Sequence, residues 1–282
     1  MRIDELLKGA YERLTFVSDT AQLDAQLLLA HVLDVSTAYF YTWPDKVLDE
    51  PHPAEFERLI QRREQGEPIA YIIEHQAFWT LDLEVAKCTL IPRADTERLV
   101  EVALELIDPD SKNQLLDLGT GTGAIALALA SELPASTVIG IDFNEAAVAL
   151  AKRNAERNQL AVTFLQSSWF DQLDAQCQFN LIVSNPPYID PDDEHLAQGD
   201  VRFEPKSALV AEDHGLADIL HIIERAPSYL AESAYLVFEH GYDQGEAVRR
   251  AFLEKGYTEV KTYQDLAGND RVTQGCKPSI NR

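Results

Sequence analysis

Positive charge is scarce in this sequence. Its 282 residues include 24 Lys and Arg against 47 Asp and Glu, which gives a formal net charge of −23. Both the first 70 residues and the remainder are net negative, so neither part offers a basic surface by composition. Because broad capture of a phosphate backbone depends on Lys and Arg, the composition argues against a general nucleic-acid-binding protein.

Cysteine is also scarce. Cys88, Cys177 and Cys276 lie far apart, and no Cys or His residues have the spacing of zinc ligands. We therefore predict neither a disulfide framework nor a metal site, and the low cysteine content fits a reducing cytoplasm.

Long hydrophobic runs are missing as well. The longest one, from Ala124 to Ala130, is far shorter than the ~20 residues of a membrane-spanning helix. Charges at Arg2, Asp4 and Lys8 interrupt any signal-peptide core. We expect a cytoplasmic protein without membrane contact.

What the chain does have is enough apolar residues, 46%, for about two folded domains. Helical spacing of apolar residues predicts a small N-terminal helical bundle over residues 1–68, which Gly66 and Pro68 end. Residues 69–90 are expected to form a β-hairpin linker, with two short strands between Ala70 and Val85. Residues 91–282 would form the larger domain.

In that larger domain, strand and helix patterns alternate. The expected strands are QLLDL, TVIGID, VTFLQ, NLIVSN, AYLVFEH and two final strands near 258–262 and 271–274. Single helices between strands predict an α/β fold, a doubly wound, mostly parallel seven-stranded sheet with helices on both faces. Ligands of such sheets bind at the carboxyl ends of the strands, so the loops after Asp117, Asp142, Gln166 and Ser184 are the candidate site.

A glycine-rich loop follows the first of these strands. It consists of Gly119, Thr120, Gly121, Thr122 and Gly123. Its GxGxG spacing differs from the GxGxxG of dinucleotide-binding proteins, which weakens a dehydrogenase interpretation. Asp142, at the end of the next strand, can accept hydrogen bonds from ribose hydroxyls. A tight turn for the loop and a helix-capping role for Asp142 remain open alternatives.

A second motif follows the apolar strand LIVS and consists of Asn185, Pro186, Pro187 and Tyr188. The two prolines remove backbone donors and stiffen the loop, so the Asn side chain and nearby carbonyl groups can serve as fixed acceptors. Such a loop suits a planar NH2 group. The structural alternative is a simple strand terminator.

In this order, DLGTGTG, Asp142 and NPPY resemble class I S-adenosylmethionine-dependent methyltransferases that act on amide or exocyclic amino nitrogens. NPPY is shared by glutamine-N5 and adenine-N6 enzymes and does not choose between them. Further stretches extend the resemblance nearly end to end to the peptide chain release factor N5-glutamine methyltransferases: PIAYIIEHQAFW, LIPRADTERLVE, VRFEPKSALVAEDHGL, FEHGYDQGEAV and GNDRVTQG. Family members often have proline at the position of Ala94, a change that should loosen a turn.

The resemblance implies methyl transfer from S-adenosyl-L-methionine to the glutamine of the Gly-Gly-Gln motif in class I release factors, which modulates translation termination. S-adenosyl-L-homocysteine is the implied product. The implied cofactor-binding residues are Gly119, Thr120, Gly121, Thr122 and Gly123, with backbone N–H groups as donors, together with Asp142, Trp169 and Asn185. The implied catalytic and substrate-binding residues are Asn185, Pro186, Pro187 and Tyr188, and the N-terminal domain would recognise the substrate.

Three alternatives stay open beside this interpretation. One is glutamine methylation of another protein, such as a ribosomal protein. DNA adenine-N6 methylation conflicts with the acidic composition, because base flipping needs phosphate contacts. A noncatalytic nucleoside-binding module is disfavoured by the intact NPPY. Arg93 and Glu239 fall near the expected pocket without an assigned role, and the oligomeric state is not predicted.

Overall fold

The computed structural model describes residues 1–277, which fall into two compact units. The helical unit comprises Met1–His75 together with Glu194–Phe203, and the sheet unit comprises Gln76–Asp193 and the chain from Glu204 onward. No helix within the described residues is long and apolar enough to cross a membrane.

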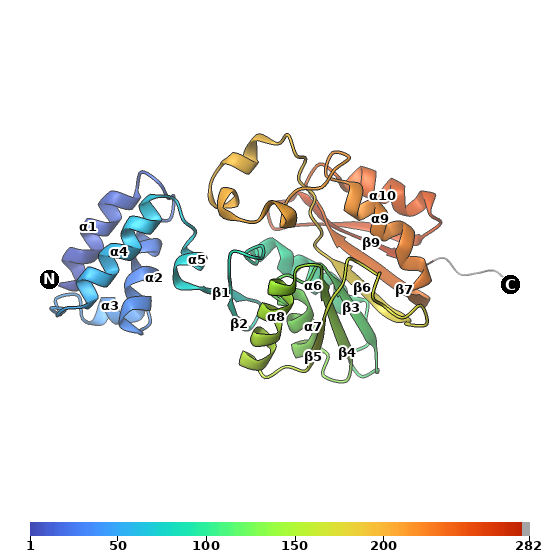
Figure 1. The fold of residues 1–282 in the computed structure, drawn as a ribbon, viewed down its shortest axis with the longest axis horizontal. Coiled ribbons are helices and arrows are strands. Elements are labelled where there is room, and N and C mark those ends of the chain that lie inside the picture. Colours follow the sequence, from blue (N-terminus) through green and yellow to red (C-terminus); the bar gives the residue numbers. More distant parts are fainter. Residues whose placement is uncertain (278–282) are drawn as a thin grey trace. The chain divides into compact units, whose positions relative to one another are not determined.

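The helical unit is built around one apolar core. Figure 1 labels its helices, in blue to cyan. Its helices are α1 (Ile3–Leu14), α2 (Ala21–Leu33), α3 (Ala38–Thr42), α4 (His52–Glu64) and α5 (Ile69–Ile73). The N-terminal bundle was predicted, except that α4 begins at His52, before Pro53, and that the short α3 was not foreseen. Acidic side chains in the first turn of α1 and a basic one in its last turn match the helix dipole.

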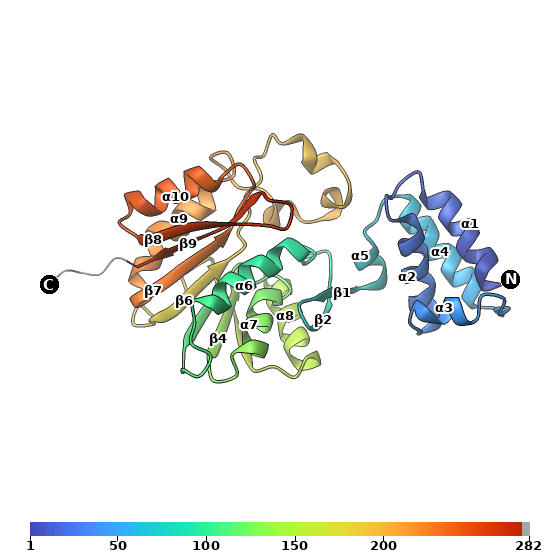
Figure 2. The same cartoon turned by 180° about the vertical axis from the view of Figure 1, so that it is seen from behind.

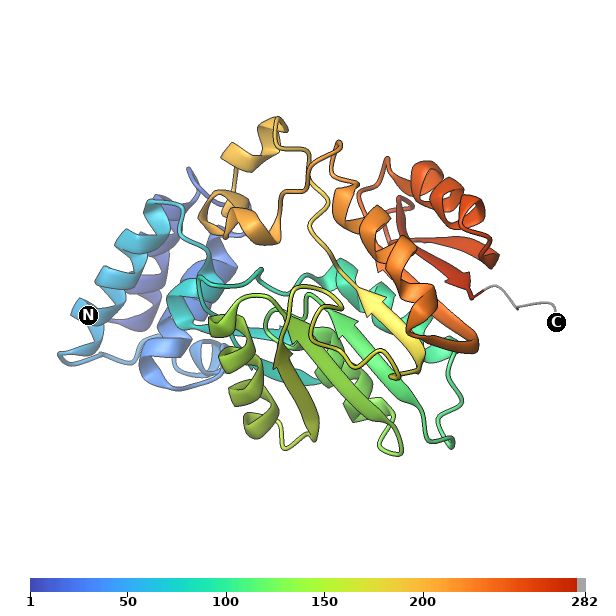
Figure 3. The same ribbon diagram turned by 45° about the vertical axis from the view of Figure 1, so that its right-hand side comes forward.

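The segment Glu194–Phe203 joins this unit although it is distant in sequence; Figure 3 shows its short helical turns in gold. The buried guanidinium of Arg63 lies 2.7 Å from a carboxylate oxygen of Asp24 and 3.5 Å from one of Asp200. Arg202 donates to the Gln65 carbonyl oxygen at 3.1 Å. Because a buried cation needs acceptors, these contacts hold the segment at the end of α4.

The predicted strand over Tyr71–Ile73 is wrong, because these residues form α5. The hairpin is shorter than expected and consists of β1 (His75–Phe78) and β2 (Leu81–Glu84). Pro68, with the fixed φ of proline, directly precedes α5, and Glu74 ends the helix in the left-handed conformation with φ of 58°. In a run of only a few apolar residues, periodicity cannot distinguish a helix from a strand, which explains the error.

The sheet unit confirms the predicted fold class. Its seven strands lie in the order β5-β4-β3-β6-β7-β9-β8. Figure 2 labels β4, β6, β7, β9 and β8 of this sheet. They are β3 (Gln114–Leu118), β4 (Thr137–Asp142), β5 (Val162–Gln166), β6 (Phe179–Ser184), β7 (Leu230–Glu239), β8 (Thr258–Gln264) and β9 (Asp270–Cys276). The first five run parallel, and β9 is antiparallel to both β7 and β8. Strand order reverses between β3 and β6, which opens a crevice at their carboxyl ends.

Helices cover both faces of this sheet. One core joins α6 (Glu97–Glu105), α7 (Ala124–Glu132), α8 (Glu145–Arg157) and the hairpin, and the other joins α9 (Ala217–Arg225) and α10 (Gly245–Glu254). Leu115 belongs to the first core and its neighbour Leu116 to the second, so β3 is buried on both sides. That explains why Leu115 and Leu116, which face opposite sides of the sheet, are both apolar instead of alternating with polar residues.

Candidate active site

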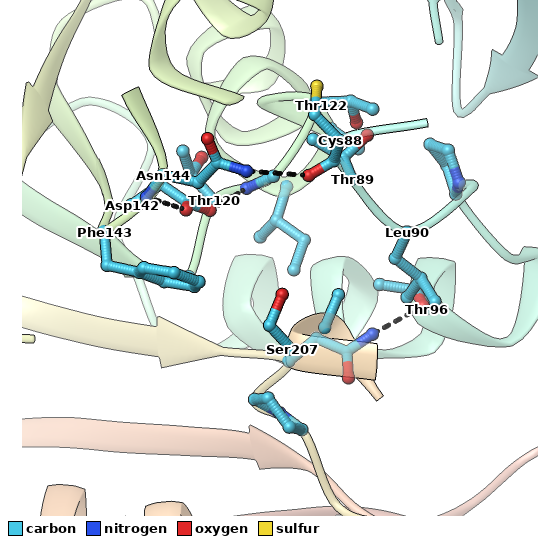
Figure 4. A pocket seen from close by; sticks show the side chains of 18 of the residues that line it. Cys88, Thr89, Leu90, Thr96, Thr120, Thr122, Asp142, Phe143, Asn144 and Ser207 are labelled. Carbon is cyan, nitrogen blue, oxygen red and sulfur yellow. Dashed lines mark hydrogen bonds between the residues drawn. The ribbon is translucent and has the colours of Figure 1, made fainter. Parts of the chain in front are cut away.

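A cavity of about 230 Å³ lies at the carboxyl ends of β3, β4, β5 and β6. Of the predicted site residues, Gly119, Thr120, Gly121, Thr122, Asp142, Trp169, Asn185 and Pro187 line it, whereas Gly123, Pro186 and Tyr188 do not. In Figure 4, Asp142, Phe143 and Asn144 stand on one side of the cavity and Thr96 and Ser207 on another. The four loops expected from sequence thus enclose one space.

The glycine loop bends sharply against β4. Gly119, Gly121 and Gly123 have φ values of 72°, 55° and 85°, which strain any residue with a Cβ. A Cβ on Gly123 would also come within 3.0 Å of the Phe164 ring. The positive φ values, together with the lack of room for a Cβ at Gly123, explain why every second residue of the loop is glycine.

Four of the five backbone N–H groups of the loop donate within the chain, so the loop offers fewer donors to a ligand than its sequence suggests. The N–H groups of Gly119 and Thr120 both donate to the Ile141 carbonyl oxygen at 2.8 Å, and that of Gly123 donates to the Thr120 carbonyl oxygen at 2.8 Å. The Gly121 N–H donates to Asp142 at 2.9 Å. The loop therefore contributes close backbone approach to a ligand rather than a row of free N–H groups.

Asp117 holds the glycine loop from beneath. Its Oδ2 accepts from the Thr120 hydroxyl at 2.6 Å and from the Ala126 N–H at 3.2 Å, while Oδ1 has no partner among the described residues. The carboxyl group is fully buried, and burial raises its pKa to about 7. In the folded protein the carboxyl group therefore stays protonated at pH values at which an exposed aspartate is ionised.

This burial predicts a pH-dependent stability. Because the folded pKa is raised, the folded state binds more protons than the unfolded chain between the two pKa values, so stability falls as pH rises toward 7. Between pH 5 and pH 8 we expect Asp117 to contribute a loss of about 2–3 kcal/mol in unfolding free energy. Asp117→Asn should reduce the change in unfolding free energy between pH 5 and pH 8 by that amount, as measured by urea titration at both pH values. An equal pH dependence of the unfolding free energy in wild type and variant would contradict the raised pKa of Asp117.

Asp142 lies where β4 ends, and its buried carboxylate faces the cavity. Its Oδ2 accepts from the Gly121 N–H and its Oδ1 from the Asn144 N–H, both at 2.9 Å. The cap of α8 is Asn144, whose side chain accepts from the Ala146 N–H at 3.0 Å. Asp142 is therefore not the helix cap. Each carboxylate oxygen keeps a further lone pair for a ligand hydroxyl.

Trp169 adopts the left-handed conformation, with φ of 45°, in the loop after β5. Its ring faces Gly119, where a Cβ would lie 3.6 Å from a ring carbon. It interacts through a side-chain hydrogen bond with Asp218, another cavity-lining residue, whose pKa is raised by burial. The arrangement presents a flat aromatic surface beside a carboxyl group. Sequence reasoning missed Asp218 because a helix start carries no signal of a pocket.

The NPPY loop is fixed by contacts with distant elements. The Asn185 Nδ2 donates to the Thr96 hydroxyl oxygen at 3.2 Å, and the Tyr188 hydroxyl donates to Glu239 at 3.1 Å. The Tyr188 carbonyl oxygen accepts from Gln244 at 3.0 Å. Burial, followed by the charge of Glu239, raises the pKa of Tyr188 well above its ordinary value. The Tyr188 hydroxyl therefore stays protonated at neutral pH and is not a base.

Several lining residues were not predicted from sequence: Phe78, Cys88, Thr89, Leu90, Pro92, Thr96, Ser207, Ala208 and Asp218. Arg93, which had no assigned role, pairs with the buried Glu204. The same carboxylate accepts from the Ile91 N–H at 3.0 Å, so it anchors the chain beside the cavity. Within residues 1–277, no three His, Cys, Asp or Glu side chains are grouped to hold a metal ion.

Two family models match this chain. The PrmC N-terminal domain matches residues 5–73, and the methyltransferase small domain matches residues 96–203. Three curated relatives are each named release factor glutamine methyltransferase. The protein of Vibrio cholerae is 55% identical and that of Aliivibrio fischeri 52%, with at least 96% of each chain covered. The protein of Escherichia coli is 48% identical over 98% of this chain and 99% of its own.

Solved structures with less sequence similarity share the fold. A methyltransferase from Pyrococcus furiosus is 18% identical, with a TM-score of 0.56 over 78% of this chain and 98% of its own. The catalytic domain of human Mettl16, solved with an RNA hairpin, has a TM-score of 0.57 at 14% identity, over 83% of this chain and 82% of its own. At these sequence identities the similarity shows a shared fold and nothing more.

Proposed function

This chain belongs to the family of release factor glutamine methyltransferases, and from that premise we propose that it methylates the Gly-Gly-Gln glutamine of class I peptide chain release factors. The methyl group would come from S-adenosyl-L-methionine and would be placed on the side-chain amide nitrogen, N5. S-adenosyl-L-homocysteine would be the product, and the methylated nitrogen, which is then strongly acidic, would release one of its protons. The observation that supports this most is the Asn185 side chain, held at the cavity with its NH2 group already engaged.

The cavity has the chemistry that this cofactor needs. One of its carboxyl groups, Asp142, has lone pairs for two ribose hydroxyls, and the Trp169 ring is an aromatic surface that suits a purine. The curved backbone of residues 119–123 would approach the amino-acid part closely, without side chains in the way. When bound, the cofactor supplies an electrophilic methyl group on a sulfonium, whose leaving group is neutral.

The residues of the NPPY loop would prepare the nucleophile. An amide nitrogen is weakly nucleophilic because its lone pair is delocalised into the carbonyl group. With Nδ2 bound to Thr96, the Oδ1 of Asn185 is the atom left to accept one N–H of the glutamine, and the Pro186 carbonyl would accept the other. Two acceptors point the nitrogen at the methyl group and raise its electron density. Pro187 and Tyr188 would pack against the flat amide.

We assign substrate recognition to residues 1–68, a linker to residues 69–90 and catalysis to residues 91–282. Release factors act in translation termination, so the reaction would take place in the cytoplasm, with no membrane and no nucleic acid in direct contact. The acidic composition supports a protein acceptor over DNA.

The test is transfer of a labelled methyl group from S-adenosyl-L-methionine to purified release factor. A Gly-Gly-Ala variant of the factor and duplex DNA serve as parallel acceptors. We expect label on the wild-type factor alone. Label on DNA would support adenine methylation instead, and label on neither factor nor DNA would refute the proposed substrate.

A further inference from the structure

The NPPY loop has few means of fixing its own backbone. Pro186 and Pro187 lack an N–H group, so neither can donate to a neighbouring segment. Before the loop, the chain is held in β6, which ends at Ser184. After the prolines, the first backbone donor is Tyr188, whose N–H donates to the Leu209 carbonyl oxygen at 3.2 Å. The direction of the Pro186 carbonyl, which we assign as an acceptor, therefore depends on how firmly the chain is held at Tyr188.

The Tyr188 carbonyl oxygen is held by the side chain of Gln244. The Gln244 Nε2 donates to this oxygen at 3.0 Å and to the His214 carbonyl oxygen at 3.2 Å. Its Oε1 accepts from the Gly241 N–H at 2.9 Å. One amide thus connects the NPPY loop, the segment before α9 and the turn before α10.

These three hydrogen bonds fix the orientation of the Gln244 amide. A turned-over amide would place its NH2 group against the Gly241 N–H and its oxygen against two carbonyl oxygens. The residue is only 9% exposed, which leaves little water to replace a lost contact. An ionised carboxyl group could not donate to the carbonyl oxygens, and an apolar side chain could serve none of the three groups. The position therefore requires an amide.

Gln244 does not serve the helix that it precedes. It occupies the cap position of α10, but its side chain makes no cap hydrogen bond with that helix. The residues favoured at such positions are Ser, Thr, Asp and Asn, whose shorter side chains reach the first turn. The side chain of Gln244 is instead committed to the contacts with Tyr188, His214 and Gly241.

Gly215 lies against the same carbonyl oxygen of Tyr188. A Cβ at this position would lie 2.1 Å from that oxygen and 2.8 Å from the Gln244 Nε2. The residue also has a φ of 81°, which strains any residue with a Cβ. Glycine therefore permits the close approach of the two backbones. Gln244 and Gly215 are together called here the Tyr188 clamp.

We propose that Gln244 and Gly215 are positioning residues for methyl transfer, which fix the Tyr188 backbone and, through it, the direction of the Pro186 carbonyl. The inference rests on the proposed function, because it assigns both residues to the same reaction. Neither residue lines the cavity. We therefore expect both to act on turnover and not on cofactor binding.

The first test is Gln244→Met, which keeps the length of the side chain and removes its three hydrogen bonds. A displaced Pro186 carbonyl should lower kcat about 10- to 100-fold, because catalysis is sensitive to small errors in alignment. S-adenosyl-L-homocysteine affinity should stay within a few-fold of wild type. The matched control is Gln178→Met at the other end of β6, which should keep wild-type kcat. The Gln178 Nε2 also donates to two backbone carbonyl oxygens, those of Cys177 and Ser228, both at 3.0 Å.

The second test is Gly215→Ala, which changes the clamp from a different segment. The added Cβ would displace the Tyr188 carbonyl, and we expect a fall in kcat of similar size. The matched control is Gly268→Ala, because Gly268 has a φ of 85° and open space where a Cβ would lie. Both substitutions strain the backbone and should lower the melting temperature, whereas Gly215→Ala alone should lower kcat.

Lower kcat in Gln244→Met and in Gly215→Ala, at nearly unchanged cofactor affinity, supports the proposal. A structural role alone would lower the melting temperature and leave kcat per folded molecule at the wild-type value, and that result in either variant overturns the proposal. A loss of S-adenosyl-L-homocysteine affinity as large as the loss of kcat would overturn it as well. Should one of the two variants fail to fold, the other decides on the same criteria.

Hydrogen exchange without substrate separates this inference from the proposed function. The Tyr188 N–H, bound to the Leu209 carbonyl, should exchange slowly in wild type and in Gln178→Met. In Gln244→Met it should exchange faster, because the loop is released at this residue. Equal exchange at Tyr188 in wild type and Gln244→Met would refute the clamp, whereas absence of wild-type turnover on release factor would refute the proposed function.

Discussion

Asn185→Ala is expected to lower kcat for release factor methylation by about 1,000-fold or more, while cofactor affinity stays within a few-fold of wild type. The variant loses the oxygen that we assign to the acceptor amide, and oriented groups of this kind contribute about 100- to 1,000-fold each to catalysis. Asn185 would also align the nitrogen with the methyl group, and loss of this alignment lowers kcat further. Single-turnover kinetics with labelled cofactor measure kcat, and calorimetry with S-adenosyl-L-homocysteine measures affinity.

The matched control is Asn180→Ala on the same strand. Asn180 accepts from the Gln114 N–H at 2.8 Å at the opposite end of β6, so its loss removes an Asn hydrogen bond without touching the cavity. Its turnover should equal wild type. Wild-type turnover in Asn185→Ala would reject the acceptor role and, with it, the account of how the nucleophile is aligned.

Asp142→Ala should weaken S-adenosyl-L-homocysteine binding by about 100-fold, because hydrogen bonds to a charged group contribute about 1.5–3 kcal/mol each. The substitution also frees the Gly121 and Asn144 N–H groups, so folding must be checked by thermal melting. Burial raises the pKa of Asp142, so affinity should also decline on acidification at a higher pH than for an exposed aspartate.

Asp174→Ala is the control for the turn that Asp142 forms. Asp174 accepts from the N–H group two residues ahead, that of Gln176, at 2.9 Å, just as Asp142 accepts from Asn144, but it lies outside the cavity. Its affinity for S-adenosyl-L-homocysteine should match wild type. Unchanged affinity in Asp142→Ala would show that this carboxylate serves the backbone only.

The sheet was predictable because its pattern is local. Consecutive apolar residues such as Leu115 and Leu116 are what a strand covered on both faces requires. The single helices between strands fix parallel pairing. The position of the cavity follows from that topology, since the carboxyl ends of parallel strands share one edge. These inferences needed only neighbours in sequence.

Residues paired over long distances were not predictable in the same way. Asn185 meets Thr96 across 89 positions and Tyr188 meets Glu239 across 51, and no period or spacing relates them. The donor pattern of the glycine loop was misjudged for a related reason. The N–H groups of Gly119, Thr120 and Gly121 are used by the Ile141 carbonyl and by Asp142 on the neighbouring strand, which the loop sequence itself does not reveal.

The acceptor that we propose is the side-chain nitrogen of one glutamine. The most direct measurement is mass spectrometry of release factor peptides after incubation with this protein and S-adenosyl-L-methionine. We expect one added methyl group on the peptide that contains Gly-Gly-Gln, with fragments that place it on the glutamine and release methylamine from the side chain. A methyl group on any other residue, or an unmodified peptide from an enzyme that consumes the cofactor, would contradict it.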